Sequence, residues 1–574
     1  MSKITVLPDI LINKIAAGEV IERPASIVRE LIDNSIDAGA TKIDVEILHG
    51  GKKLIKVSDN GSGMDRDDAI LCFKRHATSK IKSEEDLFDI TSLGFRGEAL
   101  AAIAAVSKIM LTTCSDGSDA GTRIEIGANR KEDISDAPPA QGTTVEVRDI
   151  FYNTPARRKF LKSNPTELSH IIETVVQKAF ACPGISFSLV HNSSELLDVS
   201  AASDLKERFS QLYGEEFKDQ FLSSTKEARG IRVYGFFSKA DFTRAGKGHQ
   251  YIFVNNRPVK NPTVNHAVYR GYSNIIPRDR HPAYFIFLDI DHGKVDVNVH
   301  PAKREVRFEA PDEIHRAVEA AVYEALNPAT RKEPDHIPYQ EKTAPGMPAG
   351  FYYIPDSPAV AESAPEMYHN LQTDFFTSGM TPDVTSFFHI GESFFATVTG
   401  DGLLIIDQHA AHERILYEKF LCKTSLETDP LFLPLRIELP LREYHLVVGY
   451  KDFLRGLGLD VEGFGGNNVI VRSLPGELTK ADIKGLLMDI AAGIIEEETS
   501  GIKGDTPGES LLKNIASRLA CHKSVRGSEK LANEELTKMM SDLDRTAEPD
   551  RCPHGRPTRI LLSLDDLKKM FKRK

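Results

Sequence analysis

The interpretation of the N-terminal part of the chain rests on the stretch ELIDNSIDAG at residues 30–39. Written as a helix, it places four polar side chains on one face at the spacing i, i+3, i+4, i+7, namely Glu30, Asp33, Asn34 and Asp37. This face stacks carboxylates around one amide and includes no cation, although like charges at i, i+4 repel. We therefore expect a positive group against it, such as magnesium with a phosphate, where Asn34 could bind the metal and Glu30 could orient a water as general base. The stretch alone also permits an ordinary acidic surface helix.

Glycine-containing segments downstream favour the phosphate interpretation. The predicted strand 55–57 runs into DNGSG at residues 59–63, whose two glycines let the backbone come close to a ligand, although a simple turn is the alternative. RHATSK at residues 75–80 is followed by LGFRGEAL at residues 93–100, which opens into an alanine-rich helical run. Glycines just before a helix leave free backbone N–H groups at its positive end, where phosphate oxygens bind. GTTV at residues 142–145 lies on a predicted strand.

Taken in order, these four elements resemble the Bergerat nucleotide-binding fold of the GHKL ATPases, the group that contains type II topoisomerases, heat-shock chaperones, histidine kinases and MutL. The chain contains no Walker-type GxxxxGK[ST] segment that would compete with this interpretation. Two stretches, IAAGEVIERP at residues 15–24 and GFRGEAL at residues 94–100, resemble the MutL family of mismatch-repair ATPases. This resemblance runs the whole length of the chain.

The resemblance implies ATP and Mg²⁺ as cofactors and gives several residues a role. Glu30 would be the general base, Asn34 the magnesium ligand, and Asp59 the acceptor that reads the adenine amino group, with support from Thr143. The other residues expected to bind the nucleotide, most of them in a lid over the phosphates, are Asp37, Gly61, Gly63, Thr78, Ser79, Lys80, Gly94, Phe95, Arg96, Gly97, Glu98, Ala99 and Leu100.

Composition describes a chain of several domains without a membrane segment. At 574 residues it is too long for one core, and its 27% charged and 41% hydrophobic residues are ordinary for a globular protein. The six cysteines are scattered, which fits a reducing cytosol better than a disulfide framework. No signal peptide is evident, and no segment approaches the roughly 20 apolar residues of a membrane span. We therefore expect a cytoplasmic protein of the multidomain α/β class.

The first two domains are expected to be α/β units. Residues 1–204 alternate helix-like and strand-like segments, as in an α/β sandwich, and would be the GHKL ATPase domain. Residues 205–327 would be the S5-like transducer domain that the resemblance implies. Its predicted elements are strands near 231–237, 250–254 and 284–288 and a closing helix at 311–326.

The second half of the chain is expected to be a linker and one further domain. Nine of the chain's 30 prolines fall between residues 328 and 382, so we predict a disordered linker over 328–385. Order is predicted to resume near residue 387. Residues 386–574 would form an α+β dimerisation and endonuclease domain, with strands at 394–398 and 403–406.

The transducer contains VNVHPAKREV at residues 297–306, a predicted strand that gives way to a loop at Pro301. The resemblance implies that Lys303, in this loop, reaches into the nucleotide site. A cation on a long stem is suited to neutralising charge that develops on a γ-phosphate. A plain surface lysine is the alternative.

The transducer also carries a local excess of positive charge. Because the net charge of the chain is −11, DNA binding would need such a local basic surface. Between residues 242 and 288 seven cations, including Arg257 and Lys260, accompany one acid, Asp279, with three tyrosines among them. The candidates for sequence-independent contact with the DNA backbone are Arg244, Lys247, Arg270, Arg278 and Arg280. A solubilising face that pairs with acids from elsewhere is the alternative.

The C-terminal domain contains a set of candidate metal ligands. His409 and Glu413 lie one helical turn apart and point the same way, directly after a predicted strand. Sulfur and imidazole suit Zn²⁺, and carboxylates suit Zn²⁺ or Mn²⁺. The full set is Asp407, His409, Glu413, Cys521, Cys552 and His554. Together they resemble the DQHAxxExxxxE pattern and the two cysteine-containing motifs of the MutL branch that nicks DNA, which implies a metal-dependent endonuclease with Asp407 at the catalytic ion; a purely structural zinc site is the alternative.

The resemblance also implies partners: a homodimer, DNA, the mismatch-recognition protein MutS, the replication sliding clamp and a repair helicase, with no membrane. The nicking branch usually carries a glutamine-containing clamp-binding segment. The best candidate, TDPLFLP at residues 428–434, has the apolar tail but no glutamine, and so departs from the pattern on which clamp docking rests. Two other functions stay open: an ATP-hydrolysing matchmaker that does not cut DNA, and another GHKL protein such as a chaperone or topoisomerase subunit.

Overall fold

The computed structural model describes residues 18, 21–80, 93–94, 97–127, 132–244, 248–273, 275–276, 280–296, 305–327, 386–391, 393–422, 428–478, 482–500, 507–523 and 531–571. Six predictions lie outside these residues: the linker at 328–385 and the roles of Phe95, Arg96, Lys247, Arg278 and Lys303. The chain divides into two compact units, Met1–Pro328 with Leu416–Ser524, and Ala329–Ile415 with Val525–Lys574. None of the helices in the described ranges has both the length and the apolar character needed to cross a membrane.

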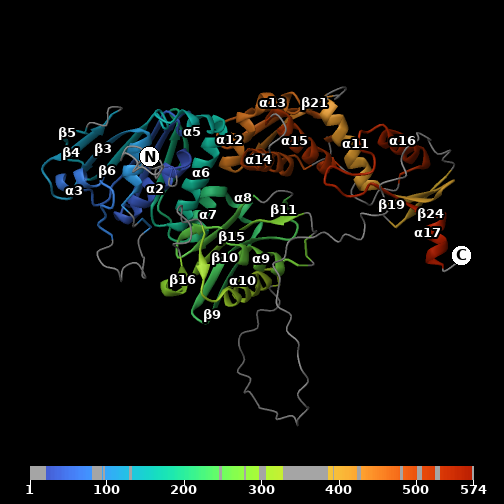
Figure 1. Cartoon of the computed structure of the whole chain (residues 1–574), viewed down its shortest axis with the longest axis horizontal. Coiled ribbons are helices and arrows are strands. Elements are labelled where there is room, and N and C mark those ends of the chain that lie inside the picture. The colour runs from blue at the N-terminus through green and yellow to red at the C-terminus, as the bar shows by residue number, and fades with distance from the viewer. Residues whose placement is uncertain are drawn as a thin grey trace, which may run out of the picture. The chain divides into compact units, whose positions relative to one another are not determined.

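The first unit begins with an eight-stranded sheet in the order β5-β4-β3-β6-β2-β1-β7-β8 (Figure 1). Its strands are β1 (Lys42–Leu48), β2 (Leu54–Asp59), β3 (Lys108–Cys114), β4 (Gly121–Ile126), β5 (Glu132–Ala137), β6 (Gly142–Arg148), β7 (Ser186–His191) and β8 (Ser194–Val199). All neighbours run antiparallel except β1 and β7. Helices α2 (Pro24–Asp37), α3 (Arg66–Leu71), α4 (Ala99–Val106), α5 (Pro155–Lys159) and α6 (Asn164–Ala181) accompany the sheet. The α/β prediction for this part of the chain is confirmed.

Helix α2 contains the stretch with which the sequence analysis began. Proline at its first position fits a helix start because that N–H has no partner within the helix, and an apolar stripe that includes Ile27, Val28 and Ile32 is buried. Asp33 is buried too and forms an ion pair with Lys178 of α6. The prediction that Asp33 shares the polar face of α2 is therefore wrong. At about 100° per residue it lies about 60° away from Glu30, and α6 covers that side.

A second sheet lies within residues 221–289, in the order β13-β12-β15-β10-β9. Its strands are β9 (Phe221–Ala228), β10 (Ile231–Ser238), β12 (Gln250–Val254), β13 (Arg257–Val259) and β15 (Tyr284–Asp289). Helices α9 (Pro262–Gly271) and α10 (Pro311–Leu326) pack on each other and share one core with the sheet, while α7 (Leu205–Tyr213) and α8 (Glu215–Lys218) precede it. The predicted strands and the closing helix at 311–326 are confirmed.

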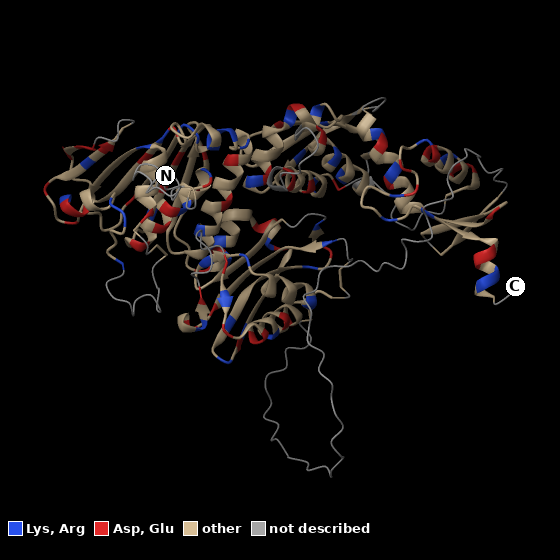
Figure 2. Cartoon of the chain, viewed as in Figure 1, with Lys and Arg blue, Asp and Glu red and all other residues tan. Residues whose placement is uncertain are grey.

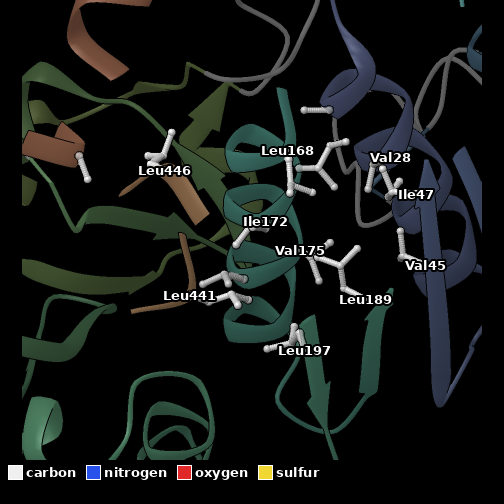
Figure 3. Close-up of a cluster of buried hydrophobic side chains, with 14 of the residues drawn as sticks. Val28, Val45, Ile47, Leu168, Ile172, Val175, Leu189, Leu197, Leu441 and Leu446 are labelled. Carbon is white, nitrogen blue, oxygen red and sulfur yellow. The ribbon is translucent and has the colours of Figure 1, made fainter. Parts of the chain in front are cut away.

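Residues 428–523 belong to the first unit. Strands β21 (Thr428–Glu438), β23 (Asn468–Pro475) and β22 (Asp460–Gly463) form a three-stranded sheet. The accompanying helices are α12 (Leu441–Gly449), α13 (Lys451–Arg455), α14 (Ile483–Ser500) and α15 (Pro507–Lys523). Figure 3 draws Leu441 and Leu446 of α12 in one buried cluster with Leu168 and Ile172 of α6. This part of the chain therefore shares a hydrophobic core with the N-terminal sheet.

The second unit is built on a four-stranded sheet in the order β18-β19-β20-β24. Its strands are β18 (Phe387–Ile390), β19 (Phe394–Thr399), β20 (Gly402–Asp407) and β24 (Arg559–Ser563). Helix α11 (Gln408–Cys422) follows β20 directly, and α16 (Asn533–Asp544) and α17 (Leu564–Met570) complete the unit. One sheet face packs on α16 through Phe395, Ile406, Leu536 and Leu543. The predicted strands at 394–398 and 403–406 are confirmed.

The ion pair between Asp33 and Lys178 gives a test of this packing. Lys178→Met should lower the free energy of unfolding by about 3–5 kcal/mol, because it leaves a buried carboxylate without its partner. The midpoint of thermal unfolding of the full chain measures the loss. In Asp33→Leu/Lys178→Met both charges are removed, and most of the stability should return; a double variant as unstable as the single one would contradict this reason.

Candidate functional site

The first candidate site is a cavity of about 740 Å³ beside α2 in the first unit. Its wall comes from α2, from the end of β2 and the loop after it, from residues 76–80, from residues 97–100 and from β6. The lining side chains include Glu30, Asn34, Asp37, Asp59, Lys80 and Thr143. The structure thus brings together most of the described residues that the sequence predicted for the nucleotide.

Three hydrogen bonds hold the carboxylate of Asp59 at the cavity wall. Its Oδ2 accepts a hydrogen bond from Ser35 Oγ at 2.7 Å. Its Oδ1 accepts from the backbone N–H of Gly61 at 2.9 Å and of Thr143 at 3.3 Å. Three donors on three different elements therefore fix one carboxylate at the cavity wall. A carboxylate oxygen has room for a further hydrogen bond, so Asp59 can accept one from a ligand amino group.

Thr143 lies opposite Asp59 because β2 and β6 pair in that register. Its Oγ1 is 3.0 Å from Thr113 Oγ1, and Thr113 in turn accepts from the N–H of Met64 at 2.9 Å. Gly63, just before Met64, has φ +65°, and a Cβ there would lie 2.0 Å from the carbonyl oxygen of Cys114. Only glycine fits this close approach. The second glycine of the DNGSG stretch therefore lets the loop pack against β3.

The acidic face of α2 does have a cation against it. Lys80 Nζ lies 2.6 Å from Asp37 Oδ2 and 3.0 Å from Asn34 Oδ1. The two carboxylate oxygens of Asp37 also accept from the backbone N–H groups of Leu93 and Gly94, each at 2.9 Å. Asp37 therefore ties the segments on either side of residues 81–92 to α2. The sequence analysis expected Asp37 to bind the nucleotide and did not detect this use.

Glu30 is positioned at the cavity with its side chain 17% exposed. Its Oε1 lies 3.2 Å from Arg29 Nη2. Across the cavity, Gly97 has φ +61°, and a Cβ there would lie 2.3 Å from the carbonyl oxygen of Ala77. The close approach joins the two segments that were predicted to form the lid, which supply Thr78, Ser79, Glu98, Ala99 and Leu100 to the cavity wall.

The predicted basic surface is smaller than the sequence suggests. Arg270 and Lys260 are exposed and Arg280 is half-buried, but Arg257 is only 8% exposed. The tyrosines at positions 251 and 272 are buried as well. Figure 2 shows Lys and Arg interspersed with Asp and Glu along the described parts of both units. A count of charges along the sequence does not reveal which of them the fold buries.

The second candidate site is a metal-ligand cluster in the second unit. Among the described residues, Glu413, Cys552 and His554 bring ligand atoms within 4.8 Å of one another. His554 Nδ1 lies 3.3 Å from Glu413 Oε1, and hydrogen bonds to Cys552 and Glu413 raise the pKa of His554 to about 9. Glu413 and Cys552 are buried, whereas the His554 side chain is 45% exposed. A carboxylate, a thiol and an imidazole are a donor set that suits Zn²⁺.

Three predicted ligands do not join this cluster. Asp407 Oδ1 accepts from the backbone N–H groups of His409 at 2.9 Å and Ala410 at 3.1 Å, so Asp407 caps the N-terminus of α11. His409 lies one helical turn before Glu413 on α11. Cys521 lies in α15, in the first unit. Sequence spacing did not indicate the capping role of Asp407.

Arg414 supports the cluster from the neighbouring position of α11. It is 4% exposed, and it donates to the carbonyl oxygen of Arg551 at 2.6 Å and to Glu548 Oε2 at 2.7 Å. The N–H of Cys552 donates to the carbonyl oxygen of Arg556 at 2.8 Å, which closes a tight loop around His554. Arg414 thereby holds this loop beside α11. Its role was not predicted, although it directly follows a predicted ligand.

Comparison with known proteins finds family matches over three stretches of the chain. Residues 22–150 match the family described as histidine kinase-, DNA gyrase B-, and HSP90-like ATPase, residues 209–327 match the C-terminal domain of DNA mismatch repair proteins, and residues 388–531 match the MutL C-terminal dimerisation domain. The DNA mismatch repair protein MutL of Thermodesulfovibrio yellowstonii is 40% identical, with 100% of both chains covered. That of Syntrophotalea carbinolica is 37% identical, over 100% of this chain and 99% of the relative.

A solved structure, the Aquifex aeolicus MutL ATPase domain complexed with ADP, is 30% identical and has a TM-score of 0.36. The match covers 47% of this chain and 93% of the solved chain.

The hydrogen bonds around Asp59 predict how the first cavity binds an adenine nucleotide. Ser35→Ala should weaken ATP binding by roughly tenfold, because a hydrogen bond to a charged group contributes about 1.5–3 kcal/mol. Isothermal titration calorimetry measures the change. Ser188→Ala is the matched control, since Ser188 Oγ donates to Asp44 at 2.6 Å outside the cavity wall; an equal effect of the two variants would contradict the proposed use of Asp59.

Proposed function

Because the chain belongs to the MutL family of DNA mismatch repair proteins, we propose that its first cavity binds ATP with Mg²⁺ and that hydrolysis there gates the protein in DNA mismatch repair. The match to the HSP90-like ATPases implies ATP hydrolysis. The observation that carries the assignment to this cavity is the carboxylate of Asp59, fixed by three donors at its wall.

The cavity residues fit the cofactor. Asp59 would accept the adenine amino group, with Thr143 beside it. Asn34 would hold Mg²⁺, which supplies charge neutralisation at the phosphates. Lys80, which contacts Asn34 and Asp37 here, would turn to the phosphates together with the backbone N–H groups of the residue 93–100 segment. Lys303 would add a cation from the transducer.

Glu30 would act as the general base for the attacking water. It lies one helical turn before Asn34, so both side chains point into the cavity. Its contact with Arg29 at 3.2 Å orients the carboxylate. General-base catalysis of this kind contributes typically about 10²–10⁴-fold to a rate.

The roles of Glu30 and Asn34 can be separated by substitution. Glu30→Ala should keep nucleotide binding and lose hydrolysis by roughly 10²- to 10⁴-fold, whereas Asn34→Ala should lose both. Phosphate release and nucleotide titration measure the two quantities. Glu46→Ala, on an exposed ion pair of β1 with Lys56, is the control. Equal hydrolysis by wild type and Glu30→Ala would remove Glu30 from the mechanism.

The second unit would hold the homodimer together. Strand register places five apolar side chains on one face of its sheet, opposite the buried core, namely Phe388, Ile390, Phe394, Val398 and Ile560. All five are at least 40% exposed, and Val398 is 72% exposed. An exposed apolar sheet face of this kind marks an interaction site. The family match to a dimerisation domain begins in this unit, at residue 388, and continues through residues 416–524 of the first unit.

We also propose that the second unit cuts DNA with bound metal. Glu413, Cys552 and His554 would retain Zn²⁺ through three protein ligands and leave a fourth position open, as catalytic zinc sites do. Asp407 and His409 would serve a second, labile ion such as Mn²⁺. Such ions would supply a hydroxide near neutral pH and positive charge beside the phosphodiester. The alternative is a matchmaker in which the zinc is only structural.

Asp407→Asn tests the nicking proposal without disturbing the helix. Asparagine keeps an oxygen that can cap α11, so zinc content, thermal stability and ATPase activity should stay at the wild-type level. Manganese-dependent nicking of supercoiled plasmid should be abolished, because the carboxylate for the labile ion is gone. Asp401→Asn, at an exposed turn of the same unit, should nick normally. If the wild-type protein does not nick the plasmid, or if Asp407→Asn nicks it as well as wild type, the nicking proposal fails. The matchmaker that does not cut DNA then takes its place.

Partners follow from the family and from exposed groups. Arg270 and Arg280, with Arg244, Lys247 and Arg278, would contact the DNA backbone irrespective of sequence. Phe432 is 98% exposed and Leu433 is 72% exposed in β21, so this segment is our candidate for docking the sliding clamp. MutS and a repair helicase would be the remaining protein partners.

A further inference from the structure

Helix α12 packs closely against the start of α6 in the first unit. Apolar side chains of both helices share one buried cluster (Figure 3). A Cβ added at Gly449 would lie 2.6 Å from Pro165 Cβ, so the two backbones meet without room for a side chain. Tyr450 OH lies 3.1 Å from Ser163 Oγ and 3.2 Å from Thr166 Oγ1. The contact has both an apolar and a polar part.

Charged groups are buried beside this apolar contact. Arg442 Nη2 lies 2.9 Å from Glu173 Oε2 of α6, and the two side chains are 14% and 27% exposed. Glu443 Oε1 lies 3.5 Å from His249 Nε2, and both side chains are less than 8% exposed. Burial lowers the pKa of His249 to about 3, so at neutral pH this imidazole is uncharged and the second contact is not an ion pair.

Arg244 of the transducer, predicted to bind DNA, lies in the same region. Its Nη2 is 3.5 Å from Met488 Sδ of α14, and a Cβ at Gly485 would lie 3.2 Å from its Nη1. Its guanidinium also stacks 4.3 Å from the centre of the Phe242 ring. Burial is the main cause of a lowered pKa of Arg244, and the carboxylates of Asp489 and Asp482 partly oppose this shift. Helix α14 therefore covers Arg244, a residue that was predicted to contact DNA.

This contact is incompletely satisfied. Arg244 Nε, Arg442 Nε and Glu443 Oε2 are buried without a hydrogen-bond partner among the described residues. Each such group opposes the contact, because water would bind it after separation. The apolar cluster favours association while these groups oppose it. Because these two contributions oppose each other, the contact of α12 and α14 with α6 and residues 242–244 is suited to reversible opening.

We propose that α12 and α14 form a detachable cover on α6 and the transducer, and that the phosphate backbone of DNA competes with this cover for Arg244. The inference rests on the proposed DNA binding. Phosphate oxygens would give the Arg244 guanidinium the charge-assisted hydrogen bonds that Met488 does not. DNA therefore binds the uncovered form more tightly and shifts the protein toward it.

A zero-length cross-link measures the covered state directly. Lys484 Nζ of α14 lies 3.7 Å from Glu216 Oε2 of α8, so a carbodiimide should join the two residues by an amide bond in the full-length protein. Mass spectrometry gives its yield relative to a Lys53–Asp149 cross-link within the N-terminal sheet region, where the atoms are 3.2 Å apart. At low salt a DNA duplex should lower the Lys484–Glu216 yield several-fold. At high salt, where phosphate contacts weaken, it should have no effect.

Gly449→Trp removes the cover without changing a charge. It should abolish the Lys484–Glu216 cross-link and tighten DNA binding several-fold, because Arg244 becomes accessible. The control is Gly184→Trp, since a Cβ added at Gly184 meets nothing within 4 Å; it should behave as wild type. A charge test is independent of the steric one: Arg442→Glu should release the cover, and Glu173→Arg/Arg442→Glu should restore the cross-link.

The outcomes distinguish a failure of the proposed cover from a failure of the proposed DNA binding. If wild type binds the duplex while the cross-link yield stays constant, the competition is absent and the proposal is overturned. It is equally overturned if Gly449→Trp loses the cross-link without a gain in DNA affinity. If neither wild type nor Gly449→Trp binds the duplex, the proposed DNA binding is what fails, and the cross-link still reports whether the cover exists.

Discussion

The structure depends on how the carboxylates of α2 are neutralised by cations from distant parts of the chain. Asp33 pairs with Lys178 and fixes α2 to α6, while Asp37 pairs with Lys80 and holds the segments that border the cavity. The two pairs act on different sides of one helix. One pair lies between two helices beside the cavity, and the other lies in the cavity wall. Glu30 and Asn34 line the cavity too, where they contact Arg29 and Lys80.

The sequence predicted the elements of the fold better than the contacts between them. Alternation and helical periodicity are local, so the strand ending at Asp59 and the helix at 311–326 could be read directly. The placement of Thr143 beside Asp59 needed the β2–β6 register, which the resemblance to a known family supplied and spacing alone could not. The burial of Asp33 was not predicted, because its partner Lys178 lies far along the chain and on another helix.

Charge and ligand motifs had the same limitation. Seven cations near one another in sequence suggested a continuous basic surface, yet the fold buries Arg257 and covers Arg244. Of the six candidate metal ligands, three form one cluster, and Asp407 caps a helix. A side chain's chemistry can be read from sequence, whereas its exposure and its partners depend on tertiary packing. This is why the residue types were informative and their grouping was not.

Helix α6 connects the nucleotide cavity with the proposed cover, because it presents Lys178 to α2 and Glu173 to α12. The two residues are five positions apart, or about 140° around the helix, so the two contacts use different faces. Both contacts combine apolar packing with an ion pair, but the Lys178–Asp33 pair is the more deeply buried, with side chains 3% and 12% exposed against 14% and 27% for Arg442 and Glu173. The contact with α12 and α14 leaves three buried polar atoms without a partner. Since such atoms favour hydration, the α12 side is the one that can open while the α2 side stays closed, and the nucleotide cavity keeps its scaffold in both states.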